Sequence, residues 1–183
     1  MVRPLRKGTT VGVERERMPA RSGRATTQSP HDLDPRVERG IEAFNDHDLE
    51  RVLDAFADDG TFYDPLLDDP VSGRELREYT AEVFEAFPDL TIDVRRVVAA
   101  TDDDVALELT YVGTHEGSMD GIPATGRRAT TETVAVLELG EDGIESWRDY
   151  FDQVAFREQL GLTFPAVLSL APKLAVRKLK AVV

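Results

Sequence analysis

The chain has 183 residues, no cysteine and a formal net charge of −13. Its length suits one domain with a core of its own, and the absence of cysteine excludes disulfides, thiol nucleophiles and thiolate metal sites. No apolar run approaches the roughly 20 residues of a membrane span, and the N-terminus lacks the apolar core of a secretory signal. We therefore expect a cytoplasmic protein.

The charge is unevenly distributed along the chain. Residues 1–30 carry a net charge of +5, residues 31–162 carry −22 with no lysine, and residues 163–183 carry +4. The acidic middle repels nucleic acid, and its many carboxylates without lysine predict adaptation to high salt, where screening weakens self-repulsion. We expect a disordered basic N-terminal extension over 1–30 and a folded domain over 31–162. A basic amphipathic tail over 163–183 is expected to lie on the acidic body, to lie on a membrane surface, or to be loose.

Helical spacing of apolar residues predicts three helices in the first part of the domain. Asp34-Pro35 is typical of a helix start, and Asp48 is expected to cap the second helix. Phe56 completes the apolar face of this second helix, which Gly60 is expected to end. The third helix is predicted to run from about residue 73 to residue 87.

Strands are predicted around and after these helices. A short strand is expected over 61–63, and the apolar period of two after residue 88 predicts four more, over 90–100, 105–115, 127–139 and 144–152. A short helix over 153–160 follows the last strand. Helices followed by a strand meander predict an α+β domain, with N-terminal helices packed on a strongly curved, mainly antiparallel sheet.

The last predicted strand carries two candidate catalytic carboxylates. Trp147, Asp149 and Phe151 share one face of this strand, whereas Asp152 lies on the other face beside the helix start. The flanking aromatic residues favour the interior for Asp149, where desolvation raises the pKa of a carboxyl toward the range of a general acid/base. Two alternatives stay open: Asp149 pairs with Arg127 or Arg128, and Asp152 only caps the final helix.

A histidine and several polar aromatic residues are further candidates. His115 shares a face with the apolar residues of the strand over 105–115, so it is expected inside, as a third catalytic residue or as a structural histidine. The other histidines lie elsewhere in the chain, so no metal site is predicted. We expect a pocket for a small hydrophobic molecule, with His115 and Asp149 on its wall. Its expected substrate-binding residues are Trp147, Tyr63, Tyr79, Tyr111, Glu132 and Phe151, and Asp64 and Tyr150 are further polar residues near apolar faces.

Several short motifs occur in a fixed order along the domain. They are Phe87-Pro88-Asp89-Leu90, Gly113-Thr114-His115-Glu116-Gly117, the run from Gly121 to Arg127, the segment from Asp142 to Trp147, and Gln159-Leu160-Gly161. This set resembles the SnoaL-like polyketide cyclase family of the nuclear transport factor 2-like superfamily, over about residues 34–162. The resemblance implies a cone-shaped α+β barrel with a deep pocket, a homodimer through the sheet, and ring closure by intramolecular aldol condensation without metal or cofactor.

The resemblance also implies where the chemistry takes place. The acid/base of the cyclases is an aspartate after the tryptophan of the last strand, a role that Asp149 or Asp152 can take. The strand before it contains no histidine, although the cyclases use one there. The last strand is also similar to that of limonene-epoxide hydrolases, but Glu132 and Val134 stand near the place of their arginine and aspartate. Ketosteroid isomerases share the fold and use a tyrosine that the first helix lacks, having Phe44 instead.

The sequence thus predicts an enzyme without cofactor that carries out acid/base chemistry on a hydrophobic carbonyl compound. Its class is expected to be a cyclase, an isomerase-like lyase or a hydrolase. The alternative is a non-catalytic module of the same fold, which binds a small ligand or a partner through its sheet.

Overall fold

A computed structural model describes residues 33–164, 166 and 167. The predicted extension over 1–30 lies outside the described residues, as does most of the predicted tail over 163–183. No helix in the described part is long and apolar enough to span a membrane. The elements in chain order are α1 (Pro35–Asn45), α2 (Leu49–Ala55), β1 (Phe56–Tyr63), β2 (Val71–Ser72), α3 (Gly73–Ala86), β3 (Thr91–Ala100), β4 (Asp104–Thr114), β5 (Arg128–Leu139), β6 (Ile144–Phe151) and α4 (Gln153–Gln159).

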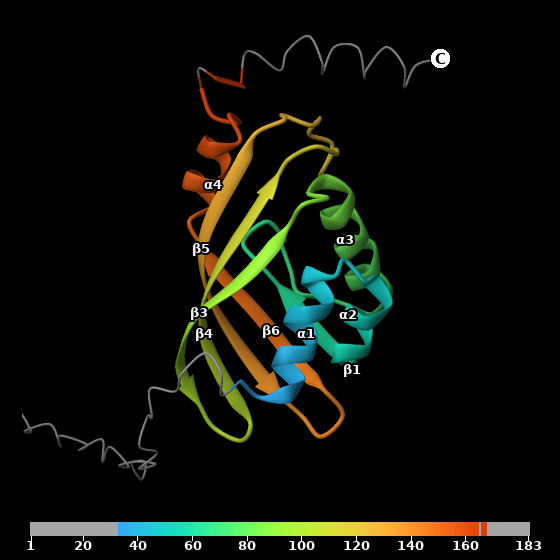
Figure 1. The fold of residues 1–183 in the computed structure, drawn as a ribbon. Helices are drawn as coiled ribbons and strands as arrows, with labels where there is room; N and C mark the ends of the chain where they lie inside the picture. Colours follow the sequence, from blue (N-terminus) through green and yellow to red (C-terminus); the bar gives the residue numbers. More distant parts are fainter. Residues whose placement is uncertain (1–32, 165, 168–183) are drawn as a thin grey trace, which may run out of the picture.

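The strands of the described residues form one six-stranded sheet in the order β2-β1-β6-β5-β4-β3. Strands β1 and β6 run parallel, and all the other neighbouring strands are antiparallel. The sheet is strongly bent, and α1, α2 and α3 cover one of its faces (Figure 1). This arrangement confirms the predicted α+β fold with N-terminal helices on a curved, mainly antiparallel sheet. Because β2 and β3 are edge strands, the curved sheet is not closed into a full barrel.

The N-terminal helices begin where the sequence predicts. The Asp34 carboxylate accepts a hydrogen bond from the backbone N–H of Arg36, with Pro35 in the first turn. Asp48 accepts in the same way from the backbone N–H of Arg51. Each cap satisfies a backbone donor that has no partner inside its own helix. The two helices therefore have defined starts, which fix their apolar faces against the sheet.

The prediction for Phe56 is wrong, because α2 ends at Ala55 and β1 begins directly at Phe56. The backbone of Phe56 is extended and pairs with Ile144 of β6. Its ring packs on Trp147, with 6.4 Å between the ring centroids. Gly60 lies inside β1 and does not end a helix. The long-range pairing with β6 outweighs the local helical spacing, and it turns a short predicted strand into a longer one.

Trp147 is the centre of the main core and is fully buried. The rings of Phe44, Phe56 and Phe62 surround its indole, with centroid distances of 5.8, 6.4 and 6.5 Å. Gly40 allows α1 to approach closely, since a Cβ atom there would lie 3.3 Å from the Trp147 ring. Helix α1 is thus seated directly on the indole.

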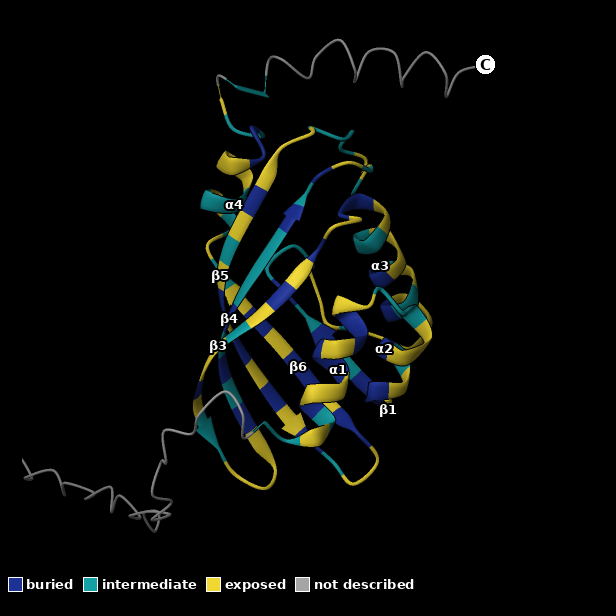
Figure 2. Cartoon of the chain, viewed as in Figure 1, coloured by how far each residue is buried: buried dark blue, intermediate teal, exposed yellow. Residues whose placement is uncertain are grey.

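A bulge in β6 explains why alternation along this strand is irregular. Leu139 pairs with Ile144, but the preceding residue Glu138 pairs with Ser146, so Glu145 is an extra, exposed residue. Ile144 and Trp147 are therefore both fully buried although their positions have opposite parity. Beyond the bulge, buried and exposed residues alternate regularly toward Asp149, as the banding of the strands in Figure 2 illustrates.

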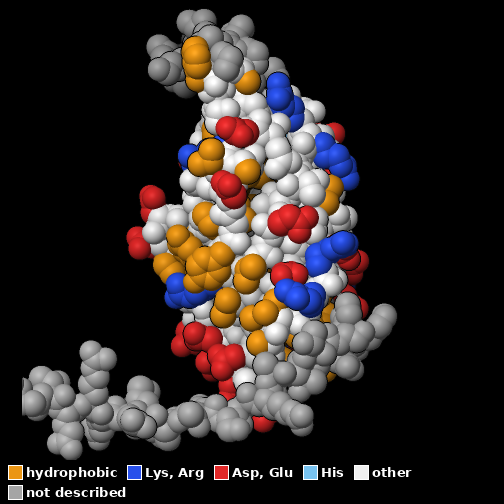
Figure 3. Space-filling view, turned by 90° about the vertical axis from the view of Figure 1, so that its left-hand side faces the viewer, with side chains coloured by type: hydrophobic (Ala, Val, Ile, Leu, Met, Phe, Trp, Pro, Cys, Tyr) orange, Lys and Arg blue, Asp and Glu red, His pale blue; other side chains and the backbone are white. Residues whose placement is uncertain are grey.

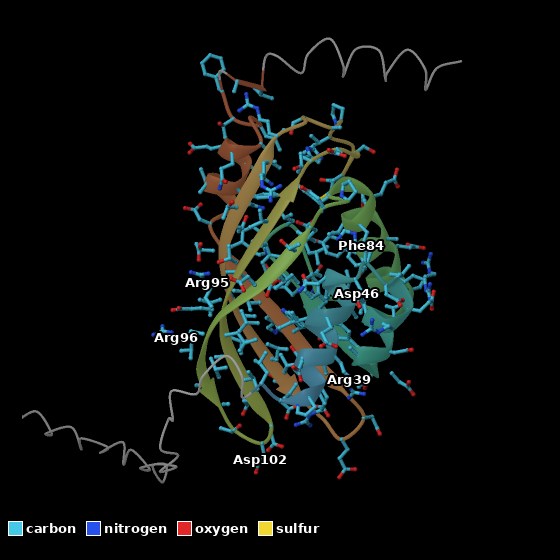
Figure 4. All side chains as sticks on the ribbon, in the orientation of Figure 1. Arg39, Asp46, Phe84, Arg95, Arg96 and Asp102 are labelled. Carbon is cyan, nitrogen blue, oxygen red and sulfur yellow. The ribbon has the colours of Figure 1, made fainter. Side chains whose placement is uncertain are left out.

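The outer face of the sheet carries exposed apolar side chains. Val134 and Tyr150 lie opposite each other on β5 and β6, and Val136 follows on β5; their exposed fractions are 42, 51 and 38%. Figure 3 shows hydrophobic side chains gathered on this side of the molecule, with charged groups around them. Arg95 and Arg96 point away from the helices (Figure 4), because the β3 register shifts between Val94 and Arg96. This face is thus partly apolar within a charged border.

Candidate active site

A cavity lies between the inner face of the sheet and α3. Aromatic rings make up much of its wall, namely Phe44, Phe62, Phe87, Phe151 and Phe156 together with Tyr79 and Tyr111. Among the described residues that line it, Asp64 and Asp149 are the only charged side chains. An apolar pocket with a few convergent polar groups is the usual form of a small-molecule site. In residues 33–164, 166 and 167, no three carboxylate or histidine side chains are grouped so as to hold a metal ion.

Asp149 is the most deeply buried acid of this cavity, with 3% of its surface exposed. The Trp147 indole N–H donates to Oδ1 over 2.8 Å, and the Tyr111 hydroxyl donates to Oδ2 over 2.7 Å. Burial raises the pKa of Asp149 from 3.8 to about 7; the two hydrogen bonds oppose this shift, and the nearby Asp64 adds to it. Asp149 can therefore both accept and release a proton near neutral pH.

The local sequence explains how the two donors reach Asp149. Trp147 lies two residues earlier on the same face of β6, so its indole is next to the carboxylate. Tyr111 comes from β4 and reaches across β5, whose residues on this face, Thr133 and Ala135, are small. The alternative of a salt bridge from Asp149 to Arg127 or Arg128 is not observed among the described residues, and Arg128 pairs with Asp89 instead.

Asp64 is a second buried carboxylate of the cavity, with 7% of its surface exposed. The Tyr79 hydroxyl of α3 donates to its Oδ2 over 2.5 Å, and the backbone N–H of Leu66 donates to its Oδ1 over 2.7 Å. Burial raises the pKa of Asp64, and these hydrogen bonds oppose the shift. Sequence reasoning marks Asp64 only as polar and near an apolar face. The available signal is that Asp64 continues the alternation of the buried Phe62 beyond the end of β1.

Thr133 gives the cavity a hydroxyl group without a partner among the described residues. The side chain is 3% exposed and lines the cavity, yet its Oγ1 makes no hydrogen bond within the described part of the chain. A buried hydroxyl without a partner is unfavourable for stability. Its position in a cavity wall means that a ligand oxygen can supply the missing bond. Sequence reasoning missed Thr133, because alternation places it inside but does not show whether it has a partner.

The three predicted catalytic residues lie in three different settings. Asp149 lines the cavity, whereas Asp152 is exposed and accepts hydrogen bonds from the backbone N–H groups of Val154 and Ala155, as a cap of α4. His115 is buried, but it does not line the cavity. Its Nδ1 lies 3.2 Å from the Thr125 hydroxyl, and its ring stacks on Phe87. The structure thus brings neither Asp152 nor His115 to Asp149.

The predicted substrate-binding residues divide between the cavity, the core and the outer side of the sheet. Tyr79, Tyr111 and Phe151 line the cavity. Trp147 differs from the expectation, because its ring fills the core behind Asp149 and only its N–H is directed at the carboxylate. Tyr63 and Glu132 are not in the wall, since their neighbours along β1 and β5 have the inward positions.

The single tryptophan of the chain makes the ionisation of Asp149 observable. Because the Trp147 N–H donates to this carboxylate, we expect its indole ¹H resonance to move downfield as the pH rises through about 7 and the charge forms. In the ¹H–¹⁵N spectrum of Asp149→Asn, this titration should disappear. A wild-type resonance that does not titrate around neutral pH contradicts the prediction.

The same ionisation can be measured independently through stability. Since the pKa of Asp149 is raised on folding, its stabilising contribution is complete below the unfolded value of 3.8 and is lost as the pH rises to about 7. The unfolding free energy of wild type relative to Asp149→Asn should therefore fall across this window, by about 2–4 kcal/mol. Urea denaturation at several pH values measures the difference.

Comparison with known proteins places this site in a family. The model of the SnoaL-like polyketide cyclase family matches residues 36–160. The chain is 34% identical over 61 residues to the aklanonic acid methyl ester cyclase DnrD of Streptomyces peucetius, a match that covers 33% of this chain and 42% of that relative. The chain thus spans less than half the length of the curated cyclase it matches.

Solved structures resemble the whole domain. The structure of AclR, a putative hydroxylase from Streptomyces galilaeus, is similar with a TM-score of 0.60 and 26% identity, over 70% of this chain and 94% of that chain. The structure of IdmH, a putative polyketide cyclase from Streptomyces antibioticus, has a TM-score of 0.58 and 27% identity, over 69% of this chain and 96% of that chain. With the family model matching over most of the fold and the acidic cavity inside the matched region, the chain belongs to the SnoaL-like polyketide cyclase family.

Proposed function

We propose that the protein is an enzyme without cofactor that catalyses enolisation and ring closure of a hydrophobic carbonyl compound inside the cavity. The observation that carries this proposal is the buried Asp149, whose pKa is raised to about 7 in an aromatic cavity. An acid tuned to neutral pH in such a place is suited to proton transfer rather than to holding the fold. The cyclase name of its curated relative supports the same class of reaction.

In the proposed reaction, ionised Asp149 removes a proton from the carbon next to a carbonyl group. The donors from Trp147 and Tyr111 hold the carboxylate in one orientation, so that the substrate meets a fixed base. The enolate carbon then attacks a second carbonyl carbon of the same molecule and closes a ring. The new alkoxide takes up the proton, and the product has the atoms of the substrate.

The Thr133 hydroxyl is proposed to donate a hydrogen bond to the enolate oxygen. Thr133 lies two residues from Ala135, the partner of Asp149 in the sheet, so its hydroxyl is on the same wall of the cavity. The tyrosine hydroxyls are already committed to the two carboxylates. A donor that is left without a partner in the described chain is therefore the one best placed to meet charge on the substrate.

The alternative function is a non-catalytic module that binds a small apolar ligand in the same cavity. The fold alone does not choose between the two functions, since related folds carry different activities. The ionisation of Asp149 and the effect of removing its charge distinguish them.

Replacing the proposed base should separate turnover from binding. In Asp149→Asn we expect exchange of the α-hydrogens of 1-indanone in D₂O, followed by NMR, to fall by about 10²–10⁴-fold. The same loss is expected for ring closure of aklanonic acid methyl ester, while calorimetric binding of either compound is kept. Asp152→Asn is the matched control, because asparagine caps α4 equally well. Binding without any wild-type turnover favours the binding module.

Thr133→Val should make the protein more stable and less active. Removing a buried hydroxyl without a partner is expected to raise the unfolding free energy by about 1 kcal/mol. Loss of a donor to the enolate oxygen is expected to lower kcat by about 10²-fold with little change in KM. Thr110→Val, a half-buried position on β4 whose hydroxyl donates to Glu132, provides the control. Equal activity of Thr133→Val and wild type contradicts the assigned role.

We further propose that the protein forms a homodimer through the outer face of the sheet. The exposed apolar side chains of Val134, Val136 and Tyr150 are the supporting observation, because contiguous apolar surface is characteristic of interaction sites. A second copy of the chain provides a matching apolar surface related by twofold symmetry.

Charged substitutions on this face test the dimer. We expect wild type to sediment as a dimer, and the double variant Val134→Glu with Tyr150→Glu to sediment as a monomer with an unchanged far-UV circular dichroism spectrum. Val154→Glu makes a similar apolar-to-acid change on α4, at a side chain with 62% exposure, and should stay dimeric. A monomeric wild type over the micromolar range contradicts the proposal.

A further inference from the structure

The two buried carboxylates of the cavity lie at corresponding places on neighbouring strands. Strands β1 and β6 run parallel, and Tyr63 at the end of β1 is opposite Arg148 of β6. One residue further along each chain are Asp64 and Asp149. Neighbouring strands are about 4.8 Å apart, so continuing this register by one residue places Asp64 and Asp149 next to each other. Both line the same cavity.

The two carboxylates have matching surroundings. Each one accepts a tyrosine hydroxyl on one oxygen and an N–H group on the other. The next residue, Pro65, is tied to α4, since the Gln153 side-chain amide donates to the carbonyl of Pro65 over 2.6 Å. No arginine, lysine or histidine is among the described residues that line the cavity. The negative charges therefore have only hydrogen bonds to balance them.

The two carboxylates do not ionise independently. The Asp64 charge contributes to raising the pKa of Asp149, after the larger effect of burial. The other titratable groups that face the pair are Tyr79 from α3 and Tyr111 from β4, whose own pKa values are well above the usual range, so they stay protonated donors; Glu82 of α3 acts on Tyr79. The first proton leaves the pair more easily than the second.

We propose that Asp64 and Asp149 are one catalytic pair that holds a single proton at neutral pH. The ionised member removes the proton next to the substrate carbonyl, and the protonated member gives its proton to the carbonyl oxygen. One C–H bond breaks and one O–H bond forms, while the pair has one proton before and after the step. No co-reactant is needed, and a keto compound becomes its enol.

This inference rests on the proposed enolisation for its chemistry, but the sharing of the proton can be tested without substrate. In Asp64→Asn the negative neighbour is gone, so we expect the Trp147 indole resonance to titrate at lower pH than in wild type. Glu132→Gln removes a charge from the exposed side of β5 and should leave the midpoint unchanged. An unchanged midpoint in a folded Asp64→Asn protein overturns the pair.

The catalytic role of the pair is tested by the pH dependence of α-hydrogen exchange in 1-indanone. Wild type should give a bell-shaped profile, because one carboxyl is needed ionised and the other protonated. Asp64→Asn should lower exchange by about 100-fold and lose one limb of the bell. Tyr79→Phe removes a donor that favours ionised Asp64, so the bell-shaped profile should move to higher pH even if Asp64→Asn does not fold.

The outcomes separate the two proposals. If Asp149→Asn abolishes exchange but Asp64→Asn leaves both profile and midpoint unchanged, the pair is overturned and the proposed function stands. If wild type exchanges nothing while Asp64→Asn still shifts the midpoint, enolisation fails but the shared proton is supported.

Discussion

The buried Asp149 carboxylate accepts hydrogen bonds from two protein donors instead of from water, and much of the domain is arranged around these two bonds. An ionised carboxyl in an apolar interior is costly unless hydrogen bonds compensate for lost hydration. The indole of Trp147 and the hydroxyl of Tyr111 supply these bonds. The indole is also the centre of the core on which α1 and β1 pack. The same ring thus fixes the hydrophobic core and orients the reactive group, so changes in one affect the other.

Strand alternation was sufficient to predict much of this arrangement. It places His115 and Asp149 inside, and the aspartate caps predict the helix starts at Asp34 and Asp48. Alternation fails where the strand register shifts, or where pairing with a strand distant in sequence determines the element. The bulge at Glu145 places Ile144 and Trp147 on one side despite opposite parity, and pairing with β6 makes Phe56 the first residue of a strand. Neither effect has a signal within the local window that periodicity reads.

The site was harder to predict than the fold, because alternation gives a face and not a cavity. Trp147 and Asp149 share a face, yet the Trp147 ring fills the core while the Asp149 carboxylate lines the cavity. The placement of Asp64 beside Asp149 depends on a parallel pairing between strands more than 80 residues apart, and the contact of Tyr79 with Asp64 depends on how α3 packs beside the end of β1. Only the assembled sheet brings these groups together.

Unfavourable features gather in this cavity, which indicates that it serves a ligand. The pKa of Asp149 is raised to about 7 and that of Asp64 is raised by burial, and the Thr133 hydroxyl lacks a partner among the described residues. Each one lowers the stability of the empty protein near or above neutral pH. A core selected only for stability has apolar residues at such positions, and strain of this kind typically accumulates at functional sites. A substrate carbonyl supplies what these groups lack, a hydrogen-bond acceptor for the hydroxyl and a carbon acid for the carboxylate, so the cost in stability and the proposed chemistry have the same origin.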